Sequence, residues 1–246
     1  MQQKQISAKY KIIRSLVKLF SPKFRVEGYE NLPKEAAIIV GNHSQMLGPI
    51  ASELYYPRKG VTWCAGEMMD KKTVPAYAFQ DFWSHKPKYT HPFYRLLSRI
   101  IAPVSQLIFT NARCIGVYHD TRILSTFKET VSALQDGQDV VIFPEHNLPQ
   151  NNILYEFQDK FIDVAKLFYR RTGKRLSFVP LYIAPRLKTM YFCPPIEFDP
   201  EAPIEEERLR ICRYLCDTIT KKAVSLPRHT VVPYRNIRRR DWPKNT

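Results

Sequence analysis

The sequence predicts an α/β fold, in which a mostly parallel central sheet is flanked by helices and an amphipathic helix lies at the N-terminus. Short apolar runs typical of buried strands alternate with longer segments whose apolar residues recur every three or four positions. Strands and helices that alternate in this order indicate an α/β layer architecture. Hydrophobic residues make up 44% of the chain and charged residues 25%, as in a folded globular protein.

The expected strands are apolar and are bounded by turn residues. They fall at 36–40, 61–67, 106–112, 139–145 and 176–184, and a short strand followed by a turn and a loop is expected over 24–33. The run "DVVIFPE" at 139–145 gives the strongest signal of a buried strand. Strands of this kind form the centre of the predicted sheet.

The expected helices are recognised by their periodicity and by their ends. They fall at 6–20, 49–56, 121–137, 156–173 and 203–224. Gly48 is expected to cap the second helix, and Pro49 suits a first helical position. We find no internal repeat and no low-complexity linker, so we expect one domain at 24–246 after a basic helical segment at 1–23.

The N-terminal helix is basic, and it has two interpretations. Its segment up to Val26 contains seven Lys or Arg residues and no acid: Lys4, Lys9, Lys11, Arg14, Lys18, Lys23 and Arg25. A basic amphipathic helix can lie in a membrane interface with its lysines toward lipid phosphates. Alternatively, it packs on its own domain and leaves the basic face in water.

The net charge of +15 indicates an anionic partner, such as anionic lipid, nucleic acid or a phosphorylated substrate. Nucleic-acid binding is supported only by this charge and by the terminal "RNIRRRDWPK", because no recognised nucleic-acid-binding pattern occurs. The glycine-rich phosphate loops GxGxxG and GxxxxGK[ST] are also missing from the sequence.

The cysteines and the hydropathy define the expected compartment. The 5 cysteines are scattered without zinc-ligand spacing, so we interpret them as core thiols and expect no metal. The sequence contains no signal-like stretch and no run of about 18 apolar residues. We therefore expect a reducing cytoplasm. The segment "FWSHKPKYTHPFY" at 82–94 is expected to be irregular and to face substrate or membrane.

Polar residues follow several of the expected strands, where sites of open α/β sheets collect. Asn42 and His43 follow the strand at 36–40, and Pro144, Glu145, His146 and Asn147 lie at the end of 139–145. Val179-Pro180 lies in the strand at 176–184. Each motif alone is weak evidence, whereas their order and spacing together are informative.

The motifs "GNHSQMLGP", "IFTNARC", "VVIFPEHN" and "FVPLYIA" together resemble the four blocks of the glycerolipid acyltransferase family. This family includes the lysophosphatidic acid and glycerol-3-phosphate acyltransferases, and the likeness runs from about residue 24 to about residue 200. The resemblance implies acyl transfer from acyl-CoA or acyl-carrier protein to a (lyso)glycerophospholipid-type hydroxyl, without a metal or tightly bound cofactor.

The resemblance also implies roles for individual residues. His43 would be the general base, because imidazole titrates near neutrality. Arg113 would pair with the acceptor phosphate. Glu145 would be catalytic, and Asn42, Pro144, His146 and Asn147 would join Arg113 in binding substrate. Backbone N–H groups near the start of the 49–56 helix are candidate oxyanion donors.

The family pattern is altered at two places. Gly48 stands where the family has the aspartate of NHx4D, and His146-Asn147 replaces the Gly-[Thr/Ser] of FPEG[TS]. In the serine-protease triad, loss of the comparable aspartate costs about 10⁴ in turnover. We therefore expect Glu145 or His146 to orient His43. The alternative is a catalytically impaired lipid-binding relative on the same fold.

The expected location is the inner face of a membrane, to which the chain would bind peripherally from the cytoplasm. The expected partners are an anionic lipid surface, an acyl thioester donor, and a phosphorylated glycerol or lysolipid acceptor.

Overall fold

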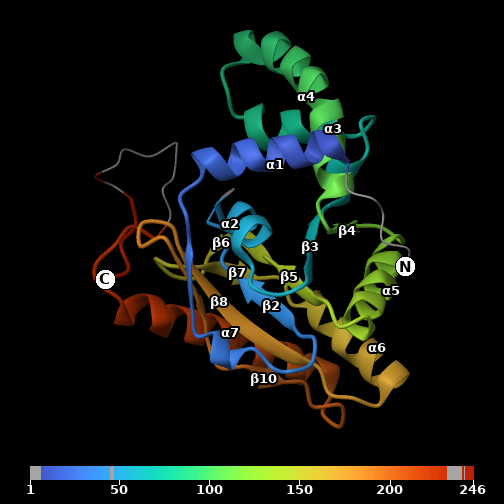
Figure 1. The fold of residues 1–246 in the computed structure, drawn as a ribbon, viewed down its shortest axis with the longest axis vertical. Helices are drawn as coiled ribbons and strands as arrows, with labels where there is room; N and C mark the ends of the chain where they lie inside the picture. The colour runs from blue at the N-terminus through green and yellow to red at the C-terminus, as the bar shows by residue number, and fades with distance from the viewer. Residues whose placement is uncertain (1–6, 45–46, 232–239, 241) are drawn as a thin grey trace. The chain divides into compact units, whose positions relative to one another are not determined.

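The structure is a computed structural model that describes residues 7–44, 47–231, 240 and 242–246 (Figure 1). The chain forms two compact units: unit 1 comprises Met1–Phe20 and Thr62–Glu129, and unit 2 comprises Ser21–Val61 and Thr130–Thr246. This division differs from the one expected from sequence, 1–23 and 24–246, which stays a prediction.

Unit 2 contains the core of the sheet. Its strands are β1 (Arg25–Glu27), β2 (Ile38–Gly41), β5 (Asp139–Ile142), β8 (Ser177–Ala184), β9 (Thr189–Phe192) and β10 (Ile196–Glu197). β2 lies between β5 and β8 and is parallel to both, and β1 is parallel to β9. β8 pairs antiparallel with β9 and with β10. The fold is thus α/β with a mostly parallel sheet, which confirms the sequence-based prediction.

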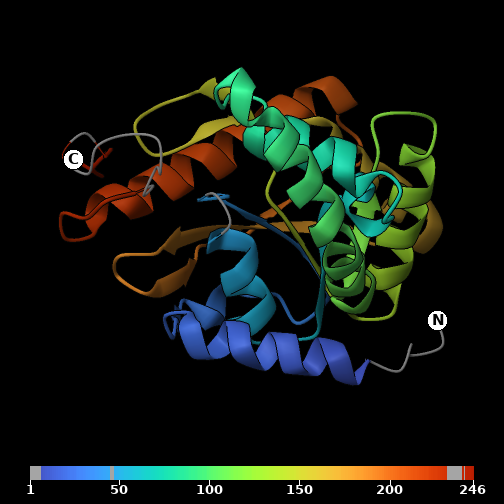
Figure 2. The same ribbon diagram turned by 90° about the horizontal axis from the view of Figure 1, so that it is seen from above.

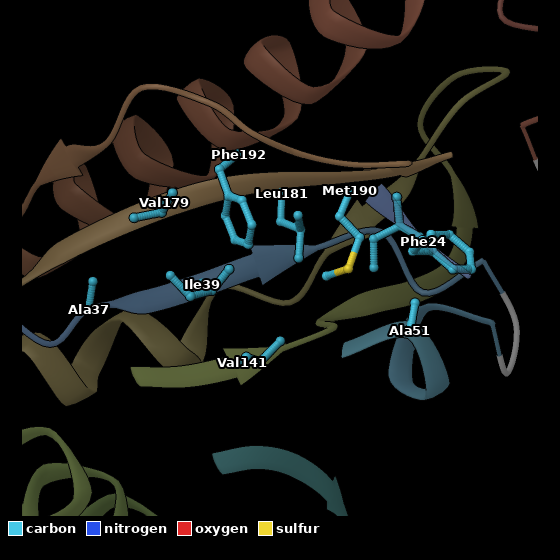
Figure 3. Close-up of a cluster of buried hydrophobic side chains, with 10 residues drawn as sticks. Phe24, Ala37, Ile39, Ala51, Val141, Val179, Leu181, Met190 and Phe192 are labelled. Carbon is cyan, nitrogen blue, oxygen red and sulfur yellow. The ribbon is translucent and has the colours of Figure 1, made fainter. Parts of the chain in front are cut away.

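The two faces of this sheet are covered by different helices. Val179 and Leu181 of β8 point into a cluster with Ala51 of α2 (Leu47–Tyr55), as Figure 3 shows. Tyr182, which lies between Leu181 and Ile183, belongs to the cluster on the opposite face with Ile219 of α7 (Ile204–Ser225). Figure 2 shows the blue α2 and the red-orange α7 on opposite sides of the light-orange β8–β9 pair. Successive strand residues alternate between faces, so both faces of β8 are apolar.

The remaining elements of unit 2 connect these strands. β6 (Glu145–Pro149) and β7 (Tyr155–Phe157) form a separate antiparallel sheet. One-turn 3₁₀ helices lie at Tyr29–Asn31 and Lys160–Ile162. α6 (Asp163–Thr172) ends at Gly173, whose φ of +68° is the left-handed conformation typical of helix C-termini.

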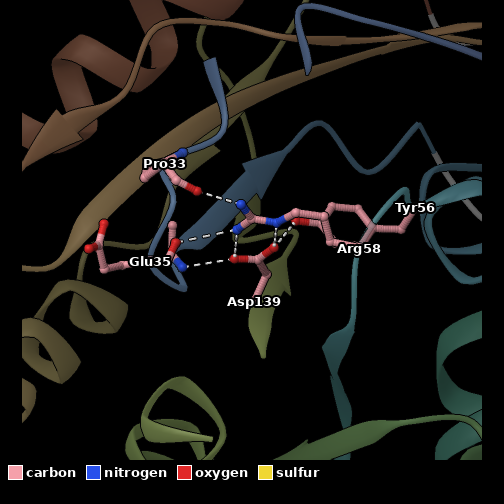
Figure 4. A network of polar contacts seen from close by, with 6 residues as sticks. Pro33, Glu35, Tyr56, Arg58 and Asp139 are labelled. Atoms are coloured by element: carbon pink, nitrogen blue, oxygen red, sulfur yellow. Dashed lines mark hydrogen bonds and ion pairs between the residues drawn. The ribbon is translucent and has the colours of Figure 1, made fainter. Parts of the chain in front are cut away.

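A polar network around Asp139 holds the N-terminal ends of β2 and β5 together (Figure 4). The Arg58 guanidinium donates to both Asp139 oxygens, from Nε at 2.7 Å and from a terminal nitrogen at 2.5 Å. Tyr56 donates its hydroxyl at 2.6 Å, and the Ala37 N–H donates at 2.9 Å. Arg58 also donates to the Pro33 carbonyl. This network joins the starts of β2 and β5.

Unit 1 contains two parallel strands and most of the shorter helices. β3 (Gly60–Ala65), which starts in unit 2, pairs with β4 (Cys114–Val117). A 3₁₀ helix (Gly66–Met69), α3 (Val74–Ala78), a π-helical turn (Phe79–Trp83), a 3₁₀ turn (Lys88–Thr90) and α4 (His91–Asn111) follow β3. α1 (Ala8–Phe20) belongs to the same unit, and α5 (Ile123–Gln135) spans the boundary between the units.

The strand expected at 106–112 is wrong, because this segment is the last part of α4. The apolar run at 107–109 fits either a helix or a strand, because a short apolar run has no period that separates the two. Thr110 and Asn111 donate back to the carbonyls of Gln106 and Leu107, as side chains do within a helix. The strand of this region, β4, begins at Cys114 instead.

Two helix boundaries also differ from those expected. The helix expected at 49–56 begins at Leu47, so Gly48 is a helical residue and not the N-cap. The segment expected as a helix at 156–173 starts as the end of β7, and its α-helical part begins only at Asp163. The helices expected at 6–20, 121–137 and 203–224 are confirmed to within two residues at their ends.

Candidate functional site

His43 lies just beyond the C-terminal end of β2, where the chain turns toward α2. The turn is tight: Ser44 has a φ of +43°, in the left-handed region, and the Gly48 N–H donates to the His43 carbonyl at 3.1 Å. The His43 ring meets the Phe143 ring edge-on, with 5.6 Å between centroids. The strand end, the turn and an aromatic ring from the neighbouring strand therefore define the position of this histidine.

Glu145, the first residue of β6, reaches the same place from just beyond the end of β5. Its Oε2 accepts the backbone N–H of His43 at 2.7 Å, and its Oε1 accepts the backbone N–H of Tyr155 at 3.2 Å. One carboxylate thus joins the start of the His43 turn to β7. The structure brings together the two residues that the sequence predicted to be catalytic.

Burial dominates the electrostatics of Glu145. Desolvation raises its pKa from 4.5 to about 7, and the N–H groups of His43 and Tyr155 limit the rise because they favour the charged form. Among the residues that the structure describes, no lysine or arginine pairs with Glu145. Its carboxyl group therefore changes charge near neutral pH.

Glu145 was also expected to orient the histidine in place of the missing aspartate. The bond at 2.7 Å is made to the His43 main chain. Glu145 therefore positions the histidine by holding its backbone. Orientation of the imidazole ring by Glu145 or by His146 stays a prediction.

Gly48 occupies a position where a side chain does not fit. A Cβ at this residue would lie 2.5 Å from the His43 carbonyl oxygen and 2.8 Å from that of Asn42. Real Cβ atoms essentially never approach backbone oxygen so closely, so an aspartate would require the turn to move. The glycine is therefore a consequence of how closely α2 begins beside His43.

The first amides of α2 are already engaged. The N–H of Leu47 donates to the Ser44 carbonyl at 3.3 Å, and that of Gly48 donates to His43. Pro49 has no N–H to offer. The N–H groups of Leu47 and Gly48 are therefore not free to act as the oxyanion donors that were expected at the start of this helix.

Asn42 extends the pairing of β2 with β8 beyond the last strand residue. Its side-chain Nδ2 donates to the Ile183 carbonyl at 3.0 Å, and its Oδ1 accepts the Ile183 N–H at 2.7 Å. The side chain is buried and substitutes for a main-chain partner. The structure therefore gives Asn42 a role in fixing the backbone before His43, which the sequence did not indicate.

The other predicted substrate-binding residues are spread over both units. Pro144 lies between β5 and β6, where its carbonyl accepts the Gln158 N–H at 2.9 Å, and His146 is an exposed residue of β6. The backbone of Asn147 lies in β6, but its side chain is outside what the structure describes. Arg113 is an exposed residue of unit 1, directly before β4. Substrate contacts by these residues stay predictions.

Sequence reasoning missed the partners that hold His43 in place. Phe143 belongs to the quoted FPE motif, but its ring contact with the histidine could not be foreseen. The Tyr155 amide had no sequence signal, because it meets Glu145 only through the pairing of β6 with β7.

The cysteines and the possible metal ligands give no sign of disulfide or metal chemistry in the described residues. None of the five cysteines, which all lie in the described part of the chain, forms a disulfide: Cys64, Cys114, Cys193, Cys212 and Cys216. In the described ranges, no group of three His, Cys, Asp or Glu residues could hold a metal ion. Helices of the described part of the chain fall short of the length and apolar character needed to cross a bilayer.

Comparison with solved structures finds a similar fold. The chain is similar to the crystal structure of the 1-acyl-sn-glycerophosphate (LPA) acyltransferase PlsC from Thermotoga maritima, with a TM-score of 0.50 and 16% sequence identity. The match covers 87% of this chain and 77% of that chain. No protein-family model matches the sequence, and a search of curated proteins finds no match. At this identity, the similarity shows a shared fold.

Proposed function

We propose that this protein transfers a fatty acyl group from a thioester, acyl-CoA or acyl-carrier protein, to the hydroxyl of a (lyso)glycerophospholipid-type acceptor. The observation that carries the proposal is the meeting of His43 and Glu145 at the C-terminal ends of two parallel strands. The fold similarity to an LPA acyltransferase and the order of the sequence motifs support the same activity.

In the proposed reaction, His43 acts as the general base. Its unprotonated ring nitrogen takes the proton of the acceptor hydroxyl while that oxygen attacks the thioester carbonyl. A C–O bond forms, and the tetrahedral intermediate collapses with cleavage of the C–S bond. The departing thiolate receives the proton back from the imidazolium. The products are an ester and a free thiol, and no metal or redox cofactor is needed.

The proposal assigns Glu145 a positioning role. By accepting the His43 N–H, it fixes the backbone from which the imidazole projects. Arg113, Pro144, His146 and Asn147 are proposed to bind the acceptor, with the Arg113 guanidinium directed to its phosphate. We propose that the protein works at the inner surface of a membrane, where anionic lipid complements its net charge of +15.

A second candidate function is lipid binding without efficient catalysis. The observation that favours it is Gly48, since the close approach of its backbone to the His43 carbonyl leaves no room for an aspartate. In the resembled family an aspartate at this position would fix the tautomer of the histidine and stabilise its cation, and Gly48 has no side chain with which to do so.

The test uses purified protein with acyl-CoA or acyl-carrier protein, a panel of lysolipids, and a thiol reagent. We expect thiol release that depends on the acceptor and falls at least about 100-fold in His43→Ala. His119→Ala, at an exposed histidine, is the matched control and should keep the rate of the parent. No thiol release by the parent with either donor, together with retained lysolipid binding, would favour the second candidate.

A further inference from the structure

α4 exposes its apolar side chains and buries its small and polar ones. Phe93, Leu96, Ile100 and Val104 are 64%, 57%, 62% and 47% exposed. They recur three or four residues apart, so they form one stripe along the helix. A helix of a water-soluble domain normally has the opposite arrangement, because burial of apolar surface stabilises the fold.

The buried side of α4 explains why its apolar residues are left outside. Ser98, Ala102 and Ser105 are the buried residues of this helix. Ala102 packs with Val74 and Ala78 of α3, and the Ser105 hydroxyl donates to the Met68 carbonyl at 3.1 Å. Small residues, satisfied hydroxyls and the partly buried Ile101 thus make the contact inside unit 1. Phe93, Leu96, Ile100 and Val104 do not belong to this buried cluster.

The charge around this stripe is of one sign. The sequence contains no acid between Asp81 and Asp120, whereas Lys86, Lys88, Arg95, Arg99 and Arg113 fall in this interval. Arg95 and Arg99 are exposed residues of α4, and the Arg95 guanidinium lies over the Phe79 ring, 5.1 Å from its centroid. An occupant of this surface must therefore offer apolar groups together with negative charge.

From these observations we infer that the outward face of α4 is a lipid-docking surface that inserts into the interface of an anionic bilayer. Phe93, Leu96, Ile100 and Val104 enter the acyl boundary, and Arg95 and Arg99 contact the lipid phosphates. A second copy of the chain fits less well, because it would bring the same arginines of both copies together without an acid to pair with them. The choice of partner rests in part on the proposed function, which places the substrates in a membrane.

α1 extends this surface within unit 1. Ile12, Leu16, Leu19 and Phe20 are exposed on it, and Tyr10 is its one buried residue in the described part. Asn111, the last residue of α4, accepts the Ser7 N–H at 2.9 Å, so the two helices are joined at their ends. Docking through α4 therefore gives the basic N-terminal helix a second element with which to bind lipid.

The first test measures binding of the full chain to vesicles. Leu96→Ser/Ile100→Ser should lower the partition coefficient on phosphatidylcholine–phosphatidylglycerol vesicles roughly tenfold or more, since two large apolar contacts are lost. The matched control is Leu209→Ser/Val224→Ser, which changes two exposed apolar residues of α7 and should bind like the parent. Circular dichroism and urea unfolding check that both variants remain folded.

A second arm tests the charge. Arg95→Gln/Arg99→Gln should weaken binding to the anionic vesicles roughly tenfold and should leave binding to pure phosphatidylcholine vesicles unchanged. Equal loss on both kinds of vesicle would contradict the assignment of these arginines to lipid phosphates.

A third arm reports insertion directly. In Phe93→Trp, brominated lipids should quench the added fluorescence, whereas Leu209→Trp should gain no quenching over the parent. Absence of quenching in Phe93→Trp, or unchanged partition of Leu96→Ser/Ile100→Ser, would overturn the inference. Concentration-dependent dimerisation that Leu96→Ser/Ile100→Ser abolishes, with vesicle binding unaffected, would assign the face to a second copy instead.

The docking surface and the proposed function can fail separately. Thiol release with a short-chain, water-soluble acceptor should be the same in the parent and in Leu96→Ser/Ile100→Ser. A parent that binds vesicles through α4 but releases no thiol would remove the proposed function and keep the docking surface. A parent that releases thiol while the α4 variants bind vesicles normally would remove the docking surface and keep the proposed function.

Discussion

The paired strands β2 and β5 have a buried or partly buried carboxylate near each end of the pair, Asp139 at the start of β5 and Glu145 at the start of β6, and the two carboxylates are held in different ways. At the N-terminal end, Asp139 is paired with the Arg58 guanidinium and also accepts bonds from Tyr56 and Ala37. At the C-terminal end, Glu145 accepts only the main-chain N–H groups of His43 and Tyr155 among the described residues.

The difference indicates that the Asp139 pair stabilises the fold, whereas Glu145 has the properties of a residue in a functional site. The side chain of Asp139 is only 1% exposed, and the Arg58 cation together with the Tyr56 and Ala37 donors offsets the cost of removing its charge from water. In return, the hydrogen bond to Asp139 raises the pKa of Arg58 above its ordinary value. Glu145 has no such cation, and burial raises its pKa to about 7. Perturbed carboxyl groups of this kind cluster at functional sites, whereas a closed ion pair at the other edge of the sheet serves the fold.

The largest effect on stability is expected when Asp139 loses its partner, the Arg58 cation. Arg58→Met should lower the free energy of unfolding by about 3–5 kcal/mol, because it leaves the Asp139 charge buried without its partner. Urea unfolding measures this loss. Arg58→Met/Asp139→Asn should recover part of it, and Arg171→Met, at an exposed arginine, serves as the control. A loss under about 1 kcal/mol would mean that the pair does not hold this edge together.

The next effect is the dependence of stability on pH that Glu145 produces. Because the pKa of Glu145 is about 7 in the folded protein and starts from 4.5, folding favours the protonated carboxyl. Its stabilisation is therefore full below about pH 4.5 and is lost as the pH rises through about 7. The stability of the parent relative to Glu145→Gln should fall by on the order of 3 kcal/mol between pH 4.5 and pH 8.

Urea unfolding of both proteins at the two pH values measures this difference. Glu201→Gln, at an exposed glutamate, controls for the general effect of pH on the chain. A constant difference between the parent and Glu145→Gln would show that Glu145 does not titrate in this range.

A smaller effect is expected at the turn between His43 and α2. Gly48→Asp and Gly48→Ala should each lower the free energy of unfolding by about 1–3 kcal/mol, because the new Cβ meets the His43 and Asn42 carbonyls. Gly48→Asp should also release thiol more slowly than the parent, since the histidine is displaced. Faster release in Gly48→Asp than in the parent would show that the aspartate can be accommodated and restores the family arrangement.

The smallest effect is a coupling between Gly41 and Phe143. A Cβ at residue 41 would lie 2.9 Å from the Phe143 Cε1 atom, on the ring that also meets His43. Gly41→Ala should therefore cost stability in the parent but less in a Phe143→Leu background, with a coupling of about 1 kcal/mol. A double-mutant cycle in urea measures it, and additive costs would mean that the ring does not constrain the strand end.

Much of the fold follows from local pattern. The apolar runs before His43 and before Glu145 form β2 and β5 because buried parallel strands are continuously apolar. α4 was missed at its C-terminal part, because a short apolar run after Pro103 has no helical period of its own. The β6–β7 pair and β9 were also not foreseen, since they depend on partners distant in sequence.

The candidate site was predicted only in part. The order of the motifs placed His43 and Glu145 at strand ends, and the pairing of β2 with β5 brings them together. The sequence also identified Gly48 as an unusual residue. It could not indicate that the glycine is required, because the limiting contact is with a backbone oxygen whose position depends on the turn.

The sequence by itself determined the alternation of strands and helices, the positions of the polar residues that follow the strands, and the excess of basic charge. These features depend on residue type and spacing along the chain. The tertiary structure alone decided that Arg58 neutralises Asp139, that Glu145 holds the backbone of His43, and that α4 turns its apolar stripe outward. The physical reason is that burial and hydrogen-bond partners are set by which segments pack together, and distant segments leave no local pattern.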